Sequence, residues 1–366
     1  MMIMENITRV DVFTGGIEGH AVYRIPSIII TRQGALLAFC EGRKSISDHS
    51  ENSIVLKRST DNGDSWESLR VLARMGRDSL NNPESVIARD IGRVILFFQC
   101  YPYPSNEHRI APGFVETRWQ KWLGLRALRS FEMHSDDDGV TWSTPRDITR
   151  QVKRPSTVTT IASGPGIGIQ LRRGKHAGRI IMPFNQGPWG KWQVYVAYSD
   201  DDGETWAMGD VAPDPGPGHA NEVQAVELSD GSILINARNQ GGTKHRKIAT
   251  SADGGQTWTK LVDDLALIEP VCQGSIIRHS DPLDGERNVL LFANPASTSA
   301  RDQGTIRASI DDGETWPLTR IIEPGNFAYS SLAVFPDKTI GCLYEAGTIT
   351  GYEKIAFAKC SDDWLS

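Results

Sequence analysis

Short runs of apolar and β-branched residues alternate with polar clusters along most of the chain. Runs of this kind cover residues 53–57, 193–198 and 304–308, and each is followed directly by a segment rich in Ser, Asp and Gly. Runs of this length, bounded by turn-forming residues, are typical of strands. The pattern therefore predicts strands that end in tight turns.

The polar segments repeat one motif, S-x-D-x-G-x-[ST]-W. Aspartate and serine side chains hydrogen-bond nearby backbone amides, and glycine supplies a positive φ, so we expect each copy to form a hairpin turn and not a catalytic or ligand site. The Trp is expected to pack between neighbouring repeat units. The five copies are STDNGDSW at 59–66, SDDDGVTW at 135–142, SDDDGETW at 199–206, SADGGQTW at 251–258 and SIDDGETW at 309–316.

The spacing of the copies indicates the size of the repeat. Successive copies begin 76, 64, 52 and 58 residues apart, which is too long for one hairpin but suits a four-stranded unit with variable loops. The tail Ser361-Asp362-Asp363-Trp364 resembles a clipped copy, and the residues before Ser59 can supply the remaining strands. We predict an all-β, six-bladed β-propeller. Since the Pro- and Gly-rich stretch 212–219 is only a loop, one domain is expected to cover residues 1–366.

Composition supports this fold class and excludes some functions. The 366 residues include 35 Gly and 10 Trp, which fits tight turns between aromatic-bearing strands. The net charge of −6 lacks the basic excess of a nucleic-acid binder, so no nucleic-acid partner is expected. Because the cysteines are odd in number and lack CxxC spacing, we expect reduced core thiols and neither disulfides nor a zinc site. These cysteines are Cys40, Cys100, Cys272, Cys342 and Cys360.

The N-terminal sequence MMIMENITRV has no basic segment followed by an apolar one, so it does not resemble a secretion signal. The longest apolar runs, such as residues 94–98, are far too short to cross a membrane. We therefore expect no membrane span and a cytoplasmic location, or a secreted or periplasmic one if a leader has been removed. The sequence carries no signal for a particular oligomeric state.

Tyr23-Arg24-Ile25-Pro26 near the N-terminus precedes the five repeats. This combination resembles the [FY]-R-I-P motif and Asp-box repeats of the sialidases, which are retaining exo-α-neuraminidases. Each signal alone is less specific than the two in this order, and the resemblance covers nearly the whole chain. It implies an enzyme that removes terminal α-linked sialic acid from glycans, glycoproteins or glycolipids, without a metal or an organic cofactor.

Sialic acid carries a carboxylate on its anomeric carbon, and the guanidinium fork matches that group with two parallel charged hydrogen bonds. The resemblance assigns this task to Arg24, Arg238 and Arg301. Arg307 competes with Arg301 for the third position, although its place in the strand before the last repeat makes a surface role more natural. Arg43 matches a further arginine that contacts the sugar.

Clustered arginines repel one another and need a carboxylate nearby when the site is empty. Glu345, in the segment Cys342-Leu343-Tyr344-Glu345, matches the family glutamate that orients the first arginine.

Asp48 lies in a polar loop after the apolar run 35–40 and matches the acid/base of the family. It would protonate the leaving oxygen and later deprotonate the attacking water, as a retaining mechanism requires. On chemistry alone, His49 and Glu51 are equally plausible candidates for this role.

The resemblance implies that Tyr329 is the nucleophile, just before a strand, and that Glu222 is its partner. Sialidases are exceptions to the two-carboxylate pattern of glycosidases because they use a tyrosine. A carboxylate nucleophile would be repelled by the carboxylate of the substrate, whereas a phenol is neutral until a base takes its proton. Glu227 is the nearest competitor of Glu222 and is expected on the far side of the same strand.

Several alternatives remain open from the sequence. Residues 80–84 and 162–169 resemble segments that line or support the family's cleft, and the stretch 102–128, with Trp119 and Trp122, fits either a rim for the aglycone or a packed loop. The enzyme could act on another nonulosonic acid, such as the deaminated form, or transfer the sugar to a second glycan. A non-catalytic glycan-binding propeller is the alternative outside the enzyme class.

Overall fold

The computed structural model describes residues 7–114, 116–155 and 157–365, and the first six residues of the N-terminal segment discussed above lie outside this range. The regular structure of the chain is mainly β-strand, as predicted, and the only α-helices among the described residues are two short ones, α1 (Arg118–Trp122) and α2 (Thr149–Val152). Within the described ranges, no helix is long and apolar enough to cross a membrane.

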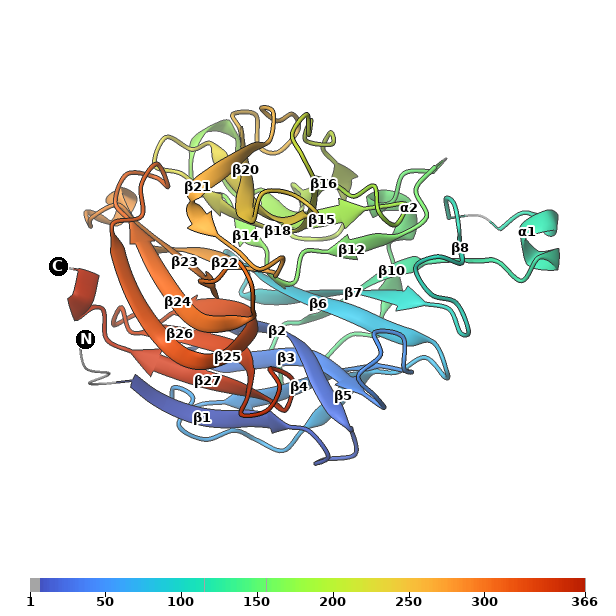
Figure 1. The fold of residues 1–366 in the computed structure, drawn as a ribbon, viewed down its shortest axis with the longest axis horizontal. Coiled ribbons are helices and arrows are strands. Elements are labelled where there is room, and N and C mark those ends of the chain that lie inside the picture. The colour runs from blue at the N-terminus through green and yellow to red at the C-terminus, as the bar shows by residue number, and fades with distance from the viewer. Residues whose placement is uncertain (1–6, 115, 156, 366) are drawn as a thin grey trace.

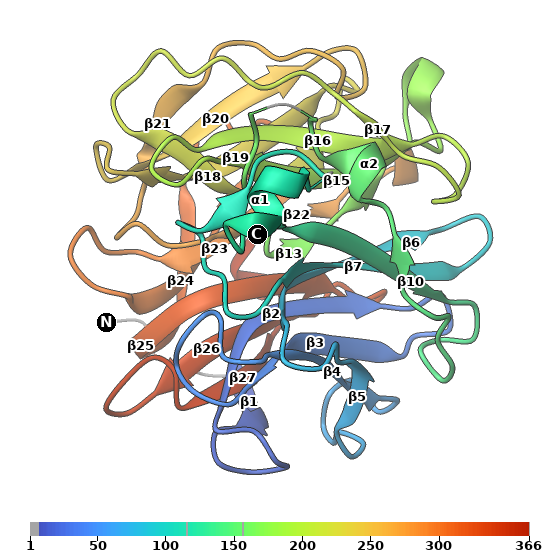
Figure 2. The same ribbon diagram turned by 90° about the vertical axis from the view of Figure 1, so that its right-hand side faces the viewer.

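Four sheets are built mainly from strands that follow one another along the chain, in antiparallel order. Both views show the sheet β2–β5 and the sheet β18–β21 on opposite sides of the molecule (Figures 1 and 2). The four sheets are β2 (Val22–Ile30), β3 (Leu36–Arg43), β4 (Ser53–Ser59) and β5 (Arg70–Ala73); β6 (Ser79–Ala88), β7 (Arg93–Tyr101), β10 (Arg129–Ser135) and β11 (Arg146–Asp147), with β13 (Gly166–Ile167) at the edge; β12 (Ile161–Ser163), β15 (Ile180–Gln186), β16 (Gln193–Ser199) and β17 (Ala207–Met208), with β14 (Ile169–Gln170) beside β15; and β18 (His219–Glu227), β19 (Ile233–Gln240), β20 (His245–Ser251) and β21 (Val262–Ile268).

A seven-stranded sheet joins the two ends of the chain. Its order is β1-β27-β26-β25-β24-β23-β22, so the N-terminal strand pairs with the last one (Figure 1). The long strand β25 pairs with β24 through its first half and with β26 through its second half. The sheet therefore consists of two four-stranded halves that share β25. Its strands are β1 (Ile7–Thr14), β22 (Ser275–Ser280), β23 (Val289–Pro295), β24 (Asp302–Ser309), β25 (Leu318–Val334), β26 (Ile340–Gly347) and β27 (Lys354–Cys360); β8 (Ile110–Ala111) and β9 (Arg126–Ala127) form a separate pair.

The five repeats form turns between the third and fourth strands of their units, which confirms the predicted role. In the first copy, the Ser59 hydroxyl accepts a hydrogen bond from the Gly63 amide at 2.9 Å, and Asp61 accepts one from the Ser65 amide at 3.0 Å. Corresponding contacts recur in the other four copies. The clipped tail differs, because it follows the last strand and leads into a short 3₁₀ helix, Asp363–Leu365.

The tryptophans of the repeats pack between neighbouring sheets, as expected. Trp206, after β16, lies 4.7 Å from Phe97 of β7, measured between ring centroids, and its indole donates a hydrogen bond to Glu132 of β10 at 2.6 Å. Trp142 similarly packs against Phe39 of β3. All five cysteines are buried and free, as the sequence analysis predicted.

The innermost strands of four units carry the same irregularity near one end. Two residues of the inner strand face one residue of its partner, which is a β-bulge that bends the strand and re-aims its side chains. Ile25 and Asn82 take positive φ values of 63° and 52° in two of these bulges. The bulges span residues 24–27 in β2, 81–84 in β6, 220–223 in β18 and 327–330 in β25.

Side-chain hydrogen bonds tie these inner strands to one another across the sheets. The hydroxyls of Ser27 and Ser85 lie 2.7 Å apart, and the Ile28 amide donates to the Ser331 hydroxyl at 3.1 Å. These bonds fix the relative positions of β2, β6 and β25, and so hold the bulged ends together.

Candidate active site

Tyr329 lies at the centre of a polar cluster at the bulged end of the inner strands. It sits inside β25, in the bulge 327–330, and not just before a strand as predicted. Its phenol donates a hydrogen bond to Glu222 Oε1, and Arg238 Nη1 donates to both the phenol oxygen at 3.0 Å and Glu222 Oε2 at 2.8 Å. Burial and the neighbouring Glu222 carboxylate raise the pKa of the Tyr329 phenol. The phenol is therefore protonated in the empty site, with a carboxylate positioned to accept its proton.

The three arginines assigned to the substrate carboxylate all surround the Tyr329 side chain. The guanidinium carbons of Arg24 and Arg301 lie 5.3 Å and 5.4 Å from the centroid of its ring, and Arg238 contacts its hydroxyl. They come from β2, the segment before β24, and β19 respectively. The structure thus brings together side chains spread over more than 270 residues of sequence.

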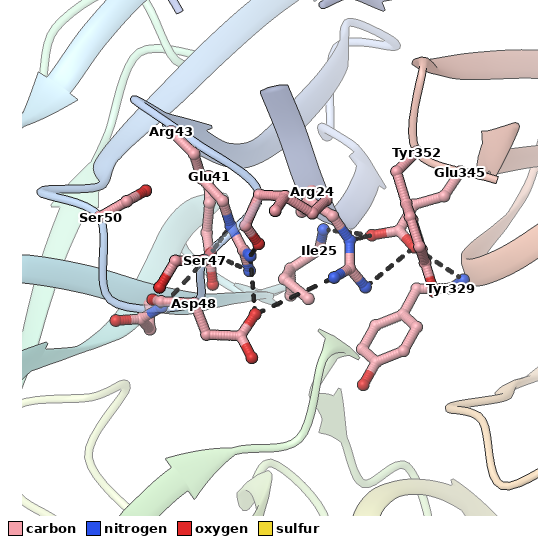
Figure 3. Close-up of polar contacts among 12 residues, drawn as sticks. Arg24, Ile25, Glu41, Arg43, Ser47, Asp48, Ser50, Tyr329, Glu345 and Tyr352 are labelled. Carbon is pink, nitrogen blue, oxygen red and sulfur yellow. Dashed lines mark hydrogen bonds and ion pairs between the residues drawn. The ribbon is translucent and has the colours of Figure 1, made fainter. Parts of the chain in front are cut away.

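Glu345 of β26 is completely buried beneath this cluster and contacts Arg24 as expected. It accepts hydrogen bonds from Arg24 Nε at 2.8 Å and Nη2 at 3.2 Å, and also from the backbone amides of Ile25 at 2.8 Å and Tyr329 at 3.3 Å (Figure 3). A buried carboxylate is stable only when its lone pairs are satisfied in this way. Glu345 therefore fixes the guanidinium and the two bulged strands at once.

Tyr352 is a site residue that the sequence did not reveal. The Arg24 guanidinium carbon lies 4.3 Å from the centroid of its ring, and its hydroxyl accepts a hydrogen bond from Arg301 Nη1 at 3.1 Å. Tyr352 lies in the loop between β26 and β27, outside every repeat and motif. It bridges two arginines that would otherwise repel each other.

Asp48 projects from the loop between β3 and β4, on the other side of Arg24 from Tyr329 (Figure 3). Its side chain is 66% exposed, and its Oδ1 lies 2.7 Å from Arg43 Nη1 and 3.9 Å from Arg24 Nη1. Desolvation by the surrounding loop opposes ionisation, but the charges of Arg43 and Arg24 outweigh it and lower the pKa of Asp48. In the empty site, Asp48 is therefore a carboxylate.

Arg43 and Glu41 form a buried support beneath Asp48. Arg43 is 1% exposed, and its Nε donates to Glu41 Oε2 at 2.7 Å while its Nη1 holds Asp48. Glu41, a second residue that the sequence analysis missed, also accepts the amide of Asn82 at 2.7 Å, and burial raises its pKa. Since the guanidinium of Arg43 is already occupied by protein groups, its contact with a sugar stays a prediction.

The Asp48 loop is anchored through its backbone. Asn52 Nδ2 and Asn81 Nδ2 both donate to the Asp48 carbonyl, at 2.8 Å and 2.7 Å. Asn81 belongs to the segment 80–84 that was expected to line or support the cleft. These two bonds fix the position of the loop while leaving its carboxylate exposed.

The competing candidates lie outside the cluster around Tyr329. His49 packs against Tyr101 with ring centroids 4.4 Å apart, and Glu51 pairs with Lys44 and Arg77. Glu227 lies at the opposite end of β18 from Glu222, where it accepts the backbone amides of Arg172 and Arg173.

Arg307, the alternative third arginine, is buried in β24 and donates to Asn294 at 2.9 Å. The expected surface role was therefore wrong, but Arg307 makes no contact with the cluster.

The irregular stretch 102–128 follows β7 at the mouth of the site. Glu107, which the sequence did not single out, is half-buried there, and burial together with the charges of Asp48 and Glu222 raises its pKa to about 7. Farther along, α1 projects from the body of the molecule with Trp119 and Trp122 stacked 4.8 Å apart (Figure 1). Their side chains are 65% and 73% exposed, so they do not form a packed loop.

The described residues contain no group of three or more His, Cys, Asp or Glu side chains arranged to hold a metal ion.

Comparison with known proteins places the chain in a family. Residues 34–343 match the BNR repeat-like domain. The sialidase of Micromonospora viridifaciens is 36% identical over 368 residues, an alignment that covers 98% of this chain and 54% of the relative. The chain thus spans about half the length of that curated relative.

Solved structures agree with this placement. The Hadza microbial sialidase Hz136 superposes with a TM-score of 0.83 at 28% identity, covering 97% of this chain and 68% of that one. A leech intramolecular trans-sialidase shares the fold with a TM-score of 0.83 at 21% identity, covering 98% of this chain and 71% of that one. The chain is a BNR repeat protein, and it belongs to the sialidase family.

Proposed function

We propose that the chain is an exo-α-sialidase that hydrolyses terminal α-linked sialic acid from glycoconjugates, with retention and with Tyr329 as nucleophile. The observation that carries the proposal is the arrangement around Tyr329, where three arginines surround the ring and Glu222 accepts the phenol's hydrogen bond. A carboxylate-bearing anomeric carbon is the substrate feature that such a group of charges fits.

We also propose that the sheets form the six blades of a β-propeller. Four sheets supply one four-stranded blade each, and the seven-stranded sheet supplies two blades that share β25. The pairing of β1 with β27 supports closure of the ring by both ends of the chain. In this arrangement the bulged inner strands point their first residues toward one mouth of the central axis.

Substrate binding in this proposal begins with the carboxylate. Arg24, Arg238 and Arg301 would hold it beside the Tyr329 ring, so that the anomeric carbon lies within reach of the phenol oxygen. Because Glu345 and Tyr352 already fix two of the guanidiniums, little reorganisation is needed when the substrate binds.

The first chemical step forms a glycosyl-tyrosine. Glu222 takes the proton of the Tyr329 phenol as its oxygen bonds to the anomeric carbon, and Asp48 gives a proton to the departing glycosidic oxygen. In the second step, Asp48 removes a proton from water as the water attacks the same carbon. The phenolate leaves and recovers its proton from Glu222, so both carboxyl groups return to their starting states.

Asp48 must therefore be protonated before the first step. The empty site disfavours this because Arg43 and Arg24 lower its pKa. A bound substrate carboxylate neutralises part of the charge of Arg24 and excludes water, and both effects raise the pKa of Asp48 in the complex.

Product analysis tests the proposal. The purified chain is incubated with α2,3-sialyllactose in water, and the products are identified by mass spectrometry and by proton NMR. We expect free sialic acid that first appears as the α-anomer. Initial release of the β-anomer would contradict retention, while an anhydro product or a new sialoside would indicate transfer. If sialyllactose binds without turnover and its deaminated analogue is also not cleaved, the chain is a binding propeller.

A further inference from the structure

A cavity lies at the ends of the inner strands opposite to the candidate active site. Its walls come from the last residues of β2, β6, β18, β22 and β25, whereas the residues around Tyr329 lie near the beginnings of four of these inner strands or in their bulges. The cavity has a volume of about 360 Å³, which is within the roughly 300–1,000 Å³ range of small-molecule sites. It is separate from the candidate active site and shares none of the proposed catalytic residues.

The walls of this cavity are mainly apolar. Branched side chains supply much of the surface, and of the five named below, three, Ile87, Ile169 and Val334, are only partly buried. A cavity lined in this way accommodates the hydrocarbon part of a ligand better than a polyhydroxylated sugar. The five side chains are Ile28, Ile87, Ile169, Val226 and Val334.

The carboxylates that line the cavity are already paired. Asp281 and Asp284 accept hydrogen bonds from Arg172 Nη1 at 3.1 Å and 2.8 Å, and Glu227 accepts one from Arg173 Nη1 at 3.2 Å. Asp281 is also held by Arg173. The charges of all three also act on Arg89 and raise its pKa, although their hydrogen bonds go to Arg172 and Arg173.

Arg89 is the exception among the charged groups of the cavity. It follows β6, and the Gln170 side chain accepts its backbone amide at 2.6 Å. Within the described part of the chain, its guanidinium has neither a hydrogen bond nor an ion pair. Arg89 is exposed at the rim of the cavity, so its guanidinium is open to a ligand, and local desolvation together with the nearby charge of Arg172 lowers its pKa. An anion bound there would pair with the guanidinium through charge-assisted hydrogen bonds.

We propose that this cavity is a second ligand site, which binds a small apolar carboxylate with its carboxyl group on Arg89. The apolar walls would receive the hydrocarbon part, and the guanidinium would bind the carboxylate through two parallel hydrogen bonds. The site does not depend on the proposed sialidase activity.

Isothermal titration of the full chain with octanoate tests the proposal, with octanol as the uncharged probe of similar shape. Free sialic acid is present at saturating concentration, so that the arginines around Tyr329 are occupied. We expect saturable 1:1 binding of octanoate and markedly weaker binding of octanol. Equal binding of both probes, or no saturable binding of octanoate, would overturn the proposal.

Two variants locate the binding. Arg89→Met keeps the length of the side chain but removes its charge, and we expect it to weaken octanoate binding about tenfold or more while octanol binding is unchanged. Val334→Phe fills the cavity and should abolish binding of both probes. Thermal melting and the far-ultraviolet circular dichroism of each variant verify that it is folded. Undiminished octanoate binding by either folded variant would place the ligand elsewhere and refute the assignment.

Discussion

The Tyr329 phenol donates a hydrogen bond to the carboxylate of Glu222, although the two residues are 107 positions apart in the chain. Both lie in β-bulges, Tyr329 in the bulge of β25 and Glu222 in that of β18. An extra residue in each inner strand re-aims its side chain, so the pair depends on two matching irregularities of the backbone. Arg238 donates hydrogen bonds to both groups, so it holds the phenol and the carboxylate in position for proton transfer from Tyr329 to Glu222.

Replacing Tyr329 by Phe removes the proposed nucleophilic oxygen and little else. We expect kcat for sialyllactose hydrolysis to fall by a factor on the order of 10³ or more. Tyr344→Phe is the matched control, because Tyr344 is an equally buried tyrosine whose hydroxyl is bonded to Glu323, away from the cluster. Wild-type kcat in Tyr329→Phe would refute the assignment, and a similar loss of kcat in both variants would point to a packing effect.

Arg238→Lys tests the recognition of the substrate carboxylate. Lysine keeps the charge but cannot reproduce the planar fork, so kcat/KM should fall about 10- to 100-fold. Arg307→Lys is the comparison, since Arg307 is also on a strand but is bonded only to Asn294 among the side chains described. Equal effects of the two substitutions would show that Arg238 has no special part in binding.

Arg43→Gln should change the pH dependence of activity. Arg43 lowers the pKa of Asp48, and the proposed acid must be protonated, so kcat/KM falls as pH rises above that pKa. Removing the charge of Arg43 raises the pKa and moves the falling limb to higher pH. The pH profile is measured on sialyllactose, because its leaving group needs protonation. Arg77→Gln serves as the control, because Arg77 pairs with Glu51 and not with Asp48. If the falling limb of the Arg43→Gln profile stays at the wild-type pH, Asp48 is not the group whose protonation limits kcat/KM.

Glu345→Gln should destabilise the fold as well as the site. Glu345 is completely buried and faces Arg24, and breaking a buried pair by removing one charge leaves the other uncompensated. We expect the free energy of unfolding to fall by about 3 kcal/mol, measured by denaturant titration. Glu67→Gln, which breaks an exposed pair with Arg58, should cost well under about 1 kcal/mol. Similar costs for the two variants would contradict this account of Glu345.

Lys153 provides a test of stability that does not involve the site. It is completely buried, and burial lowers its pKa to about 7. Between about pH 7 and the unfolded value near 10.4, the unfolded chain binds a proton that the folded chain does not, so stability rises with pH through this window. Lys153→Met removes the ionisable amine, and with it the loss of folding stability at pH values where the unfolded chain would bind its proton. The variant should melt at a higher temperature than the wild type at pH 7, with a smaller difference at pH 9; a constant difference would contradict the shifted pKa.

The elements of the fold that depend on local pattern could be predicted from the sequence. Each repeat carries its own turn chemistry, and so the strands before it and the hairpin it forms follow from neighbouring residues. The position of Tyr329 could not be predicted in this way. It was expected just before a strand, but residues 327–330 form a bulge within β25. A bulge depends on the partner strand, which lies elsewhere in the sequence.

The contacts of the site were accessible only through resemblance. Arg24 and Glu345 are 321 residues apart, and no periodicity relates them. Tyr352, Glu41 and Glu107 carry no motif, and they join the site because the tertiary structure folds their segments over it. Their roles follow from what they contact and not from what precedes them in the chain.

A covalent trap tests the central claim most directly. A 2,3-difluorinated sialic acid has a good leaving group, and its fluorine at C3 withdraws electrons and slows hydrolysis of the glycosyl-enzyme. The wild-type chain is incubated with this compound, and the labelled residue is located by peptide mass mapping. We predict one sialyl group attached to the Tyr329 oxygen and none in Tyr329→Phe. A label on Glu222 or Asp48, or turnover of the compound without any label, would contradict a tyrosine nucleophile.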